Sequence, residues 1–579
     1  MDPPRRPGAQ VGDEEETSAD PAVLSTPPST DYKAEAGPQQ QREPGAVYPK
    51  RLTQVLILTS LCLSILLVAL DQTIIAPALG AITAEFESVK DIGWYGSSYL
   101  LTTTALQPLY GKLYNSFSVK ATYLVAVFVF EVGSLVCAVA PSSTAFIVGR
   151  AVAGMGTAGL FSGSIVILAY TLPLRQRPLA FGLIGGMWGI ASVAGPLLGG
   201  AFTDHVTWRW CFYVNLPIGG ATMVAIFCLL HIKGQNKGDL GFWGKIKHLD
   251  LLGTAVLIPA VICLLLALQW GGTEYPWGSS RIIGLFVGFG AMILLFVGIQ
   301  IWKGDQGTLP PRLFKNRNVL CAMSFSAFFG SAFFPLIYYL SLYFQAIKGD
   351  DAVEAGVKIL PLLISTVVTS VLTGALISAV GRYNPFALPS MLLFTVGAGM
   401  ITTFSLDSPL RVWFGYQVLT GLGIGVGFQL GILVVQAVLP HGDIAVATAC
   451  VQFFQSLGGA IFIAVAQTVF QNGLIEGVRR DVPGLDPRVF INSGASQVRQ
   501  VLVSMGMEQY TTAVLSAYLT GLRHAYFITV ACAAAAFCAV SGMSWINIKK
   551  VEAQKAPPAS QPGTVDTAEK DPQGITSMA

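Results

Sequence analysis

The chain has 579 residues, of which 53% are hydrophobic and only 12% are charged. An ordinary soluble domain has about 25% charged residues, so this composition indicates a polytopic membrane protein and excludes a large soluble enzyme. The formal net charge of +3 and the lack of basic runs interleaved with aromatic residues exclude nucleic acid as a partner. The nine cysteines lie in apolar runs, which predicts neither a disulfide framework nor a metal site.

Residues 1–50 are rich in Pro, Glu and Gln and lack an apolar stretch, so we expect a disordered tail rather than a signal peptide. Residues 551–579 are expected to form a second disordered tail. A membrane span needs about 20 mostly apolar residues. Fourteen segments between the tails meet this requirement, at 53–78, 93–113, 119–140, 144–171, 178–200, 209–231, 250–270, 281–303, 319–343, 356–378, 387–405, 411–437, 444–470 and 525–547.

Lys and Arg concentrate in alternate short loops, beginning with Lys112 and Lys120 after the second span. Because cytoplasmic loops are enriched in these residues, we expect both termini in the cytoplasm and the connection 471–524 outside. The plasma membrane is the expected location, with a vacuolar or vesicle membrane as the alternative.

The chain also repeats itself. "GKLYNSFSVK" (111–120) and "GALISAVGRY" (374–383) share the frame Gly-x-Leu, and "RAVAGMG" (150–156) matches "QVLTGLG" (417–423) at a similar offset. Related halves around a midplane site are typical of secondary transporters. We therefore predict an N-terminal six-helix bundle at 51–231, two inserted helices with flanking loops at 232–318, and a C-terminal six-helix bundle at 319–550.

Further motifs follow in order: "LDQTIIAPAL" (70–79), "GRAVAGMGTAG" (149–159), "GIASVAGPLLGG" (189–200) and "WRWCFYVNLPIG" (208–219). Together with the repeat at 111–120 they resemble the motifs of the major facilitator superfamily, specifically its fourteen-span drug:proton antiporters of the fungal toxin and multidrug efflux type. The resemblance covers about residues 50–550. It implies an all-α membrane protein with two six-helix halves and two inserted helices.

In function, the resemblance implies proton-coupled efflux of small amphipathic molecules, with no cofactor and no enzymatic activity. The expected partners are membrane lipid, a small-molecule substrate and protons, and the expected state is a monomer. Two alternatives stay open: an importer of a nutrient or an iron-chelator complex on the same fold, and a membrane sensor that transports nothing.

The sequence departs from the family's inner-loop motif, because Asn115 and Ser378 stand where the two copies would carry an acid. We therefore expect the gate beside these loops to be held by neutral hydrogen bonds. Glycines on the span 178–200 favour close helix approach, and a proline there removes one backbone hydrogen bond. The residues assigned to gating or hinge motion are Gly111, Asn115, Gly195, Pro196, Gly200, Gly381 and Arg382.

Three charged residues lie inside predicted spans. At 1.5 Å rise per residue, Asp71 lies roughly 22–27 Å along the first span, Glu131 roughly 18 Å along the third, and Arg150 roughly 9 Å from the opposite face. Their similar depth predicts that they handle the coupled proton. The alternatives are an acid near the interface for Asp71, a structural hydrogen-bond partner for Glu131 and a fixed counter-charge for Arg150.

No Asp or Glu lies inside the spans 319–343, 387–405, 411–437, 444–470 and 525–547, and Gln417 replaces the counterpart of Arg150. Aromatic and amide side chains suit a large, mostly apolar ligand with a few polar groups. The alternative is that the amides only form hydrogen bonds between helices. The predicted substrate-binding residues are Gln72, Tyr338, Gln417, Gln429, Gln452 and Phe453.

Overall fold

The computed structural model describes residues 48–555 except 89–90, 232–243, 245, 247–248, 273, 483–484, 488 and 491–497. Most of both predicted tails and much of the basic connection after the sixth span therefore lie outside the described residues. Within the described part the chain is helical and has no strand beyond two isolated bridges. This confirms the all-α prediction.

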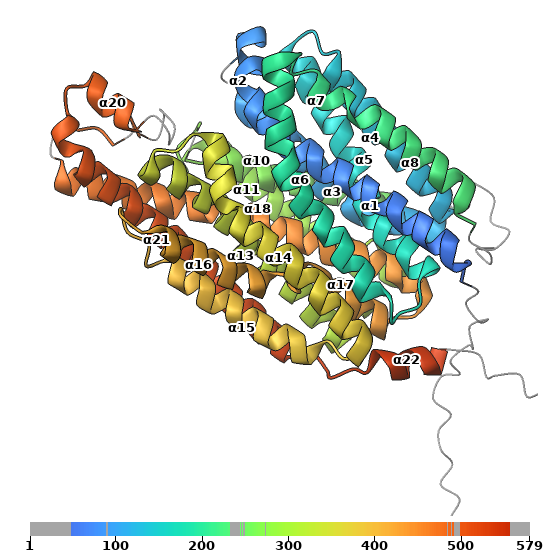
Figure 1. The fold of residues 1–579 in the computed structure, drawn as a ribbon. Coiled ribbons are helices and arrows are strands. Elements are labelled where there is room, and N and C mark those ends of the chain that lie inside the picture. The colour runs from blue at the N-terminus through green and yellow to red at the C-terminus, as the bar shows by residue number, and fades with distance from the viewer. Residues whose placement is uncertain are drawn as a thin grey trace, which may run out of the picture. The chain divides into compact units, whose positions relative to one another are not determined.

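The helices of the first half follow the predicted spans closely (Figure 1). Two spans are interrupted: 53–78 breaks at Ile74, and 209–231 breaks at Val214. In both places a proline lies three residues after the break and cannot donate the backbone hydrogen bond that a continuous helix needs. The helices are α1 (Arg51–Thr73), α2 (Ile75–Phe86), α3 (Ile92–Ser116), α4 (Val119–Ala138), α5 (Ser143–Thr171), α6 (Arg177–His205), α7 (Trp210–Tyr213) and α8 (Asn215–Leu229).

The remainder of the chain contributes the inserted pair α10 and α11 and then the second half. Short helical turns at Gly304–Gln306, Phe344–Lys348 and Glu508–Tyr510 join some of these helices. The helices are α10 (Leu251–Trp270), α11 (Ser280–Lys303), α12 (Pro311–Lys315), α13 (Arg317–Tyr343), α14 (Ala352–Val380), α15 (Asn384–Ile401), α16 (Leu410–Ile424), α17 (Gly427–Val438), α18 (His441–Asp481), α20 (Val498–Ser504), α21 (Thr511–Ser541) and α22 (Ile548–Lys555).

The predicted bounds of the long connection 471–524 are wrong. Helix α18 continues to Asp481 and α21 begins at Thr511, so much of the connection is helical. The extensions pack on each other: a β-carbon at Gly477 would lie 2.7 Å from that of Ala517. A hydropathy criterion ends a span where the residues become polar, and it misses a helix that continues on such contacts.

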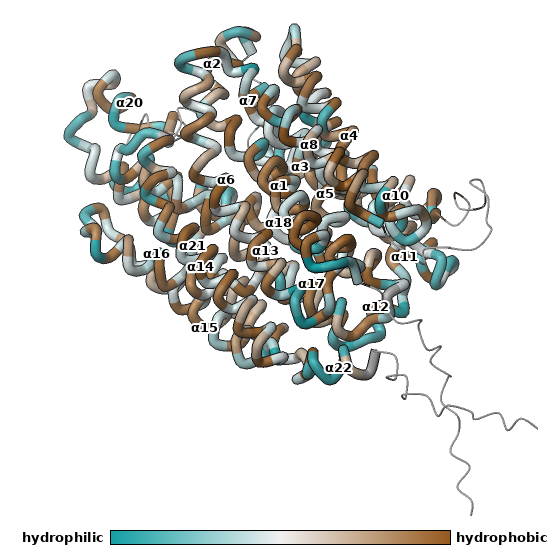
Figure 2. The backbone as a smooth tube through the Cα atoms, turned by 45° about the vertical axis from the view of Figure 1, so that its right-hand side comes forward, coloured by the Kyte–Doolittle hydropathy of each residue, from teal (hydrophilic) through white to brown (hydrophobic). Residues whose placement is uncertain are grey.

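Among the described residues, thirteen helices are long and apolar enough to cross a membrane. Helix α3 is not among them, although its 25 residues are more than a span requires, because it is rich in Ser, Thr and Tyr. With α3 the structure is consistent with the fourteen predicted spans. Hydrophobic residues dominate the long helices and hydrophilic residues gather near their ends (Figure 2), as a multi-pass membrane protein requires.

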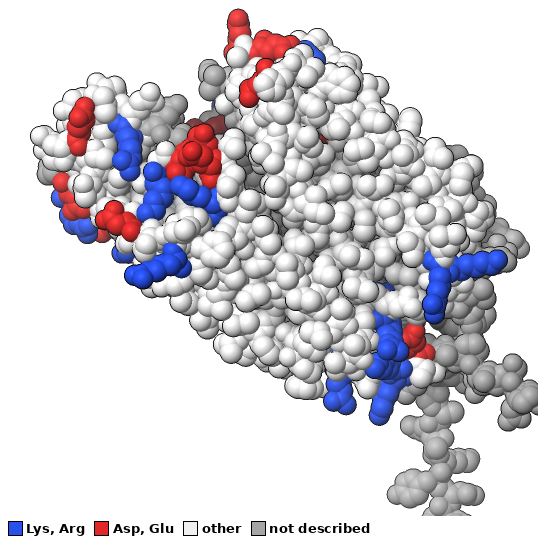
Figure 3. Space-filling view, viewed as in Figure 1, with Lys and Arg blue, Asp and Glu red and all other residues white. Residues whose placement is uncertain are grey.

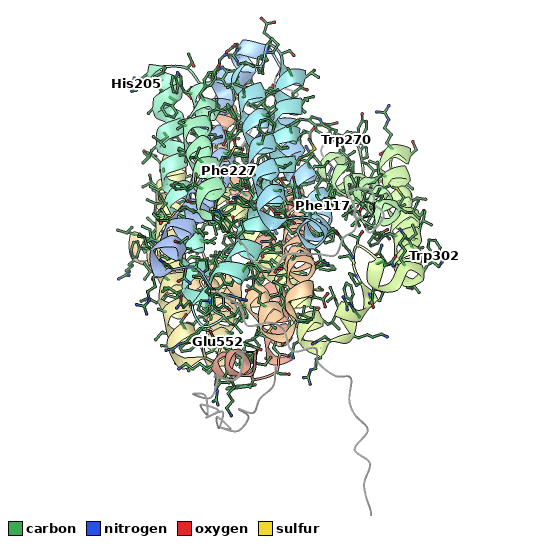
Figure 4. All side chains as sticks on the ribbon, turned by 90° about the vertical axis from the view of Figure 1, so that its right-hand side faces the viewer. Phe117, His205, Phe227, Trp270, Trp302 and Glu552 are labelled. Carbon is green, nitrogen blue, oxygen red and sulfur yellow. The ribbon has the colours of Figure 1, made fainter. Side chains whose placement is uncertain are left out.

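The two halves meet along matching helices. Helix α6 packs on α14, and α3 packs on α18, so the fifth span of each half contacts the second span of the other. The inserted α10 packs on α11, α3 and α18, whereas α11 contacts α10 and the turn that follows it. In Figure 4 the inserted pair, marked by Trp270 and Trp302, lies to one side of the other helices.

We name the two ends of the bundle by their charge. The basic end is where α1 begins and α3 ends, and Lys and Arg gather there on the face drawn in Figure 3. The opposite, far end carries acids and bases together. The basic residues of the basic end include Lys112, Arg175, Arg177, Arg312 and Lys549.

At the basic end, Asp250 fixes the inserted pair. Its fully buried carboxylate accepts hydrogen bonds from the Gln300 amide at 2.7 Å and from Thr308 N–H at 2.9 Å, and it pairs with Lys303 Nζ at 2.8 Å. Burial by itself raises the pKa of Asp250, but the bonds from Lys303, Gln300 and two backbone N–H groups outweigh it and hold the pKa well below its usual range.

Asp250→Ala should lower the free energy of unfolding at pH 7 by about 2–3 kcal/mol, because several buried donors would lose a charged acceptor. A carboxyl group whose pKa is lower in the folded state stabilises that state at pH values above the unfolded pKa of about 3.9. This stabilisation is lost as the pH falls further. Unfolding of the detergent-solubilised protein should therefore show a constant deficit down to about pH 4 and a smaller one below. Asp305→Ala, at an exposed carboxylate, is the control and should change stability by about 0.5 kcal/mol at most.

Candidate functional site

A buried ion pair lies inside the first half. Asp71 is on the stripe of α1 that faces the other helices, and Arg150 lies two turns into α5. Arg150 Nη1 is 2.6 Å from Asp71 Oδ2, and the two side chains are 2% and 0% exposed. The proximity expected from their similar depth is confirmed. Such a pair is costly to break, because either partner alone would be an uncompensated buried charge.

Polar groups from two other helices complete the ion pair. Arg150 Nε donates to the Tyr95 carbonyl oxygen at 2.9 Å, and Asn215 Nδ2 lies 3.2 Å from both Asp71 Oδ1 and Ser134 Oγ. Asn215 is not among the residues predicted from the sequence, although it lies inside the motif "WRWCFYVNLPIG". An amide in an otherwise apolar span is the signal that could have found it.

Aromatic rings cover the guanidinium group. The Arg150 Cζ atom lies 4.4 Å from the centre of the Tyr99 ring and 6.0 Å from that of Phe212. The hydroxyl group of Tyr99 is 2.7 Å from Thr157 Oγ1, and the predicted substrate residue Gln72 also interacts with Tyr99. Gln72 therefore lies beside the charged cluster and not in a separate substrate site.

Glu131 does not join the ion pair. It is 8% exposed, and within the described part of the chain neither carboxylate oxygen has a hydrogen-bond partner. Its carboxylate lies directly against the backbone of Gly219 on α8, where any β-carbon would collide with it. An ionised carboxylate without a partner is costly in an apolar interior, whereas a protonated one needs no counter-charge.

The predicted amides of the second half are buried and half-satisfied. Gln417 Nε2 donates to the Lys358 carbonyl oxygen at 2.9 Å and Gln429 Nε2 to that of Ser370 at 3.2 Å, while Gln452 Oε1 accepts from Ser162 at 2.9 Å. Each of the three amides thus links two helices. The other polar atom of each has no partner among the described residues.

The aromatic members of the predicted substrate set differ in their surroundings. Phe453 is 4% exposed and its ring centre lies 5.5 Å from that of Phe454. Tyr338, by contrast, is 55% exposed and contacts Tyr339. The structure therefore does not gather the six predicted residues into one enclosed pocket.

The two halves are in contact at the basic end. A β-carbon at Gly111 would lie 2.7 Å from that of Ala449, and one at Gly182 would lie 2.7 Å from the Ser370 carbonyl oxygen. Toward the far end, α6 and α14 are separated by a shallow apolar groove. Its lining residues are Ser192, Val193, Pro196, Leu197, Val353, Gly356, Val357 and Leu360.

The predicted hinge glycines fall into two groups. Gly195 touches Thr73 and Ile74 where α1 ends, so a side chain there would collide. Gly200 has open space around it, with no atom within 4 Å of a β-carbon, so it does not provide a close helix approach as expected. Pro196 lies inside α6, and it lines the groove.

The predicted gate of the second half is a turn at the basic end. Gly381 has φ +82° and ends α14 in the left-handed conformation that favours glycine. Arg382 follows it and pairs through its backbone with Asn547, and the Gly381 carbonyl oxygen accepts from Ile548 N–H at 2.8 Å. The segment after α21 thus docks on this turn.

The expectation that only neutral hydrogen bonds hold the basic end is wrong. Gln436 Oε1 accepts from Arg177 at 3.1 Å, and Arg312 pairs with Asp443 at 2.6 Å. Charged groups therefore bridge this end from positions outside the inner-loop motif that contains Asn115. Motif comparison alone could not reveal them.

Gly111→Leu should reduce transport about tenfold, because the closed basic end has no room for a side chain between α3 and α18 and overpacking typically costs about 1–3 kcal/mol. Gly96→Leu, on the same helix but with no atom within 4 Å of its β-carbon, is the matched control and should transport normally. The measurement is the initial rate of transport per molecule in reconstituted vesicles. Equal rates for the two variants would contradict the close contact at Gly111.

The comparisons with known proteins agree with this geometry. Residues 61–463 match the family model described as Major Facilitator Superfamily. The chain is 48% identical over 510 residues to an MFS-type efflux pump, MFS1, of Arthroderma benhamiae, covering 88% of this chain and 94% of the relative. It is 46% identical over 497 residues to the efflux pump aflT of Aspergillus parasiticus, covering 86% and 96%.

Solved structures share the fold at low sequence identity. The proton:xylose symporter XylE superposes with a TM-score of 0.55 at 13% identity, covering 86% of this chain and 99% of the other. The human organic anion transporter MFSD10 gives a TM-score of 0.53 at 15% identity, covering 83% and 99%. The family match and the efflux-pump relatives identify the chain as a membrane transporter and not an enzyme. The chain belongs to the major facilitator superfamily.

Proposed function

We propose that the protein is a proton-coupled antiporter that exports small, mostly apolar molecules. The observation that carries this proposal is Glu131, a buried carboxylate without a hydrogen-bond partner in the described chain, in the same half as the Asp71–Arg150 pair. In an apolar interior Glu131 is best accommodated with a proton. Asn215 connects the ion pair with the helix of Glu131, because its amide contacts both Asp71 and Ser134.

The geometry of the two ends supports a direction of transport. With the basic end in the cytoplasm, as the distribution of Lys and Arg favours, the halves touch closely on the cytoplasmic side, and a small apolar groove lies between α6 and α14 toward the outer side. In this state substrate leaves and a proton enters. The halves then rock about the α6–α14 and α3–α18 contacts, and proton release on the cytoplasmic side accompanies substrate loading.

The residue types of the second half support the proposed substrate class. Aromatic rings and amides with one unpaired polar atom suit a large apolar molecule that carries a few hydrogen-bonding groups. The efflux pumps to which the chain is similar support export over import. The protein acts as a monomer in the plasma membrane, with lipid, protons and the substrate as its partners and no cofactor.

The test is the retention of a fluorescent hydrophobic dye in yeast cells that express the protein, with and without a protonophore. Proton-driven export predicts low retention that rises to the level of control cells when the gradient collapses. Low retention that a protonophore leaves unchanged would contradict proton coupling. Dye retention above that of control cells would contradict export.

A further inference from the structure

The linker between the inserted pair and the second half runs across the basic end. It starts at the turn Gly304–Gln306 and continues through α12 to Asn316. Thr308, Leu309 and Leu313 are buried, so the linker lies on the protein and not in the surrounding water or headgroups. It connects an accessory pair of helices to one half, yet its contacts reach both halves.

One side of the linker is fixed to the inserted pair. Thr308 N–H and Oγ1 donate to Asp250 at 2.9 and 3.0 Å, and Leu309 N–H donates to Gln300 Oε1 at 2.9 Å. These bonds are buried and include a carboxylate, which makes them strong ones. The inserted pair therefore holds the linker in one place.

The other contacts of the linker divide between the halves. Lys112 at the end of α3 donates to the Gln306 carbonyl oxygen at 3.3 Å. Arg312 pairs with Asp443 in the first turn of α18 at 2.6 Å and with Asp305 of the linker itself at 3.2 Å. Because α3 belongs to one half and α18 to the other, opening of the basic end must break one of these two attachments.

We infer that the inserted pair serves as a latch: its linker clamps the basic end shut through Lys112 on one half and Asp443 on the other. The clamp takes over the role expected of an acid at position 115. The inference rests on the proposed rocking of the two halves, and it gives the inserted helices a role in the transport cycle. Neutralising either member of the Arg312–Asp443 pair then shifts the population toward the state that is open at the basic end.

Cys450 reports this opening without an added probe site. It is 1% exposed and follows Ala449, the residue that the backbone of Gly111 contacts. The experiment measures the alkylation rate of Cys450 by N-ethylmaleimide in the purified full-length protein, by peptide mass spectrometry. Asp443→Asn and Arg312→Gln should each raise the rate about fivefold, the scale of a partly exposed ion pair. They change the local charge in opposite directions, so altered thiol reactivity cannot explain a rise in both.

Asp305→Asn is the matched control, because Asp305 pairs with the same arginine from within the linker, and it should leave the Cys450 rate unchanged. Asp443→Glu should also keep the original rate. Cys137, buried between α4 and α5, serves as the internal standard for general unfolding. The latch is overturned if neither neutralised variant raises the alkylation rate of Cys450, or if the alkylation rate of Cys137 rises by the same factor. Since no substrate or gradient is used, this result is independent of the dye test for efflux.

Discussion

Arg150→Leu is expected to lower the free energy of unfolding by about 3–5 kcal/mol, because it leaves the Asp71 carboxylate buried without its cation. Asp71 has no exposed surface, and its other hydrogen bond, from Asn215 at 3.2 Å, is long and comes from a neutral group. Chemical unfolding of the detergent-solubilised protein, followed by tryptophan fluorescence, measures the effect. A protein this destabilised should also reach the membrane in smaller amounts.

A second substitution separates charge from packing. The double variant Asp71→Asn with Arg150→Leu buries no charge at this position and should recover most of the lost stability. Arg382→Leu, an identical change at an exposed arginine at the basic end, should change stability by about 0.5 kcal/mol at most. A double variant no more stable than Arg150→Leu would mean that the lost packing, and not the lost cation, causes the effect.

Asp71→Asn is expected to lower the rate of proton-driven transport at least tenfold, while the protein is still expressed. Asparagine keeps an oxygen that accepts from Arg150, which offsets part of the cost of leaving the buried guanidinium without its counter-charge. The position can no longer exchange between a charged and a neutral acid. The measurement is dye uptake into inside-out vesicles as a function of an imposed pH gradient. Undiminished gradient-driven uptake would contradict the assignment of Asp71.

The control for this experiment is Glu85→Gln. Glu85 pairs with Arg209 at the far end and is partly exposed, so neutralising it should leave the response to the gradient intact. Dye exchange between the two sides without any gradient should persist in Asp71→Asn, because exchange needs substrate binding and rocking but no net proton movement. Loss of exchange as well would indicate a general failure of the transport cycle.

Much of the fold could be predicted from the sequence, because the requirement for apolar spans leaves few choices in a bilayer. The errors arose where hydropathy has no influence. Pro77 breaks the first span by removing one backbone hydrogen bond at Thr73. The contact of Gly477 with Ala517 accompanies a later end of α18 and an earlier start of α21 than predicted. Such effects depend on the partner helix, which a single span does not reveal.

The depth of the candidate residues along their helices could be predicted from the sequence, but the direction in which each side chain points could not. The rise per residue correctly set Asp71 and Arg150 at the same depth. It also set Glu131 there, but this side chain faces Gly219 on α8 and makes no ion pair. Asn215 was missed because its role depends on its contacts with Asp71 and Ser134 on two other helices, which the sequence does not show. The charged contacts of Arg312 depend on a linker whose path no sequence pattern specified.

The spacing of the buried charges along the chain has a consequence for synthesis. Asp71 and Arg150 are separated by 79 residues, and Asn215 follows Asp71 by 144 residues. At about 5–20 residues per second, the ribosome supplies Arg150 roughly 4–16 s after Asp71. The first half can therefore neutralise its buried carboxylate before the second half exists. The bond between Ser162 and Gln452, 290 residues apart, joins two neutral groups and forms only after much of the second half has been made. The buried Asp71–Arg150 pair therefore does not wait for the final helices.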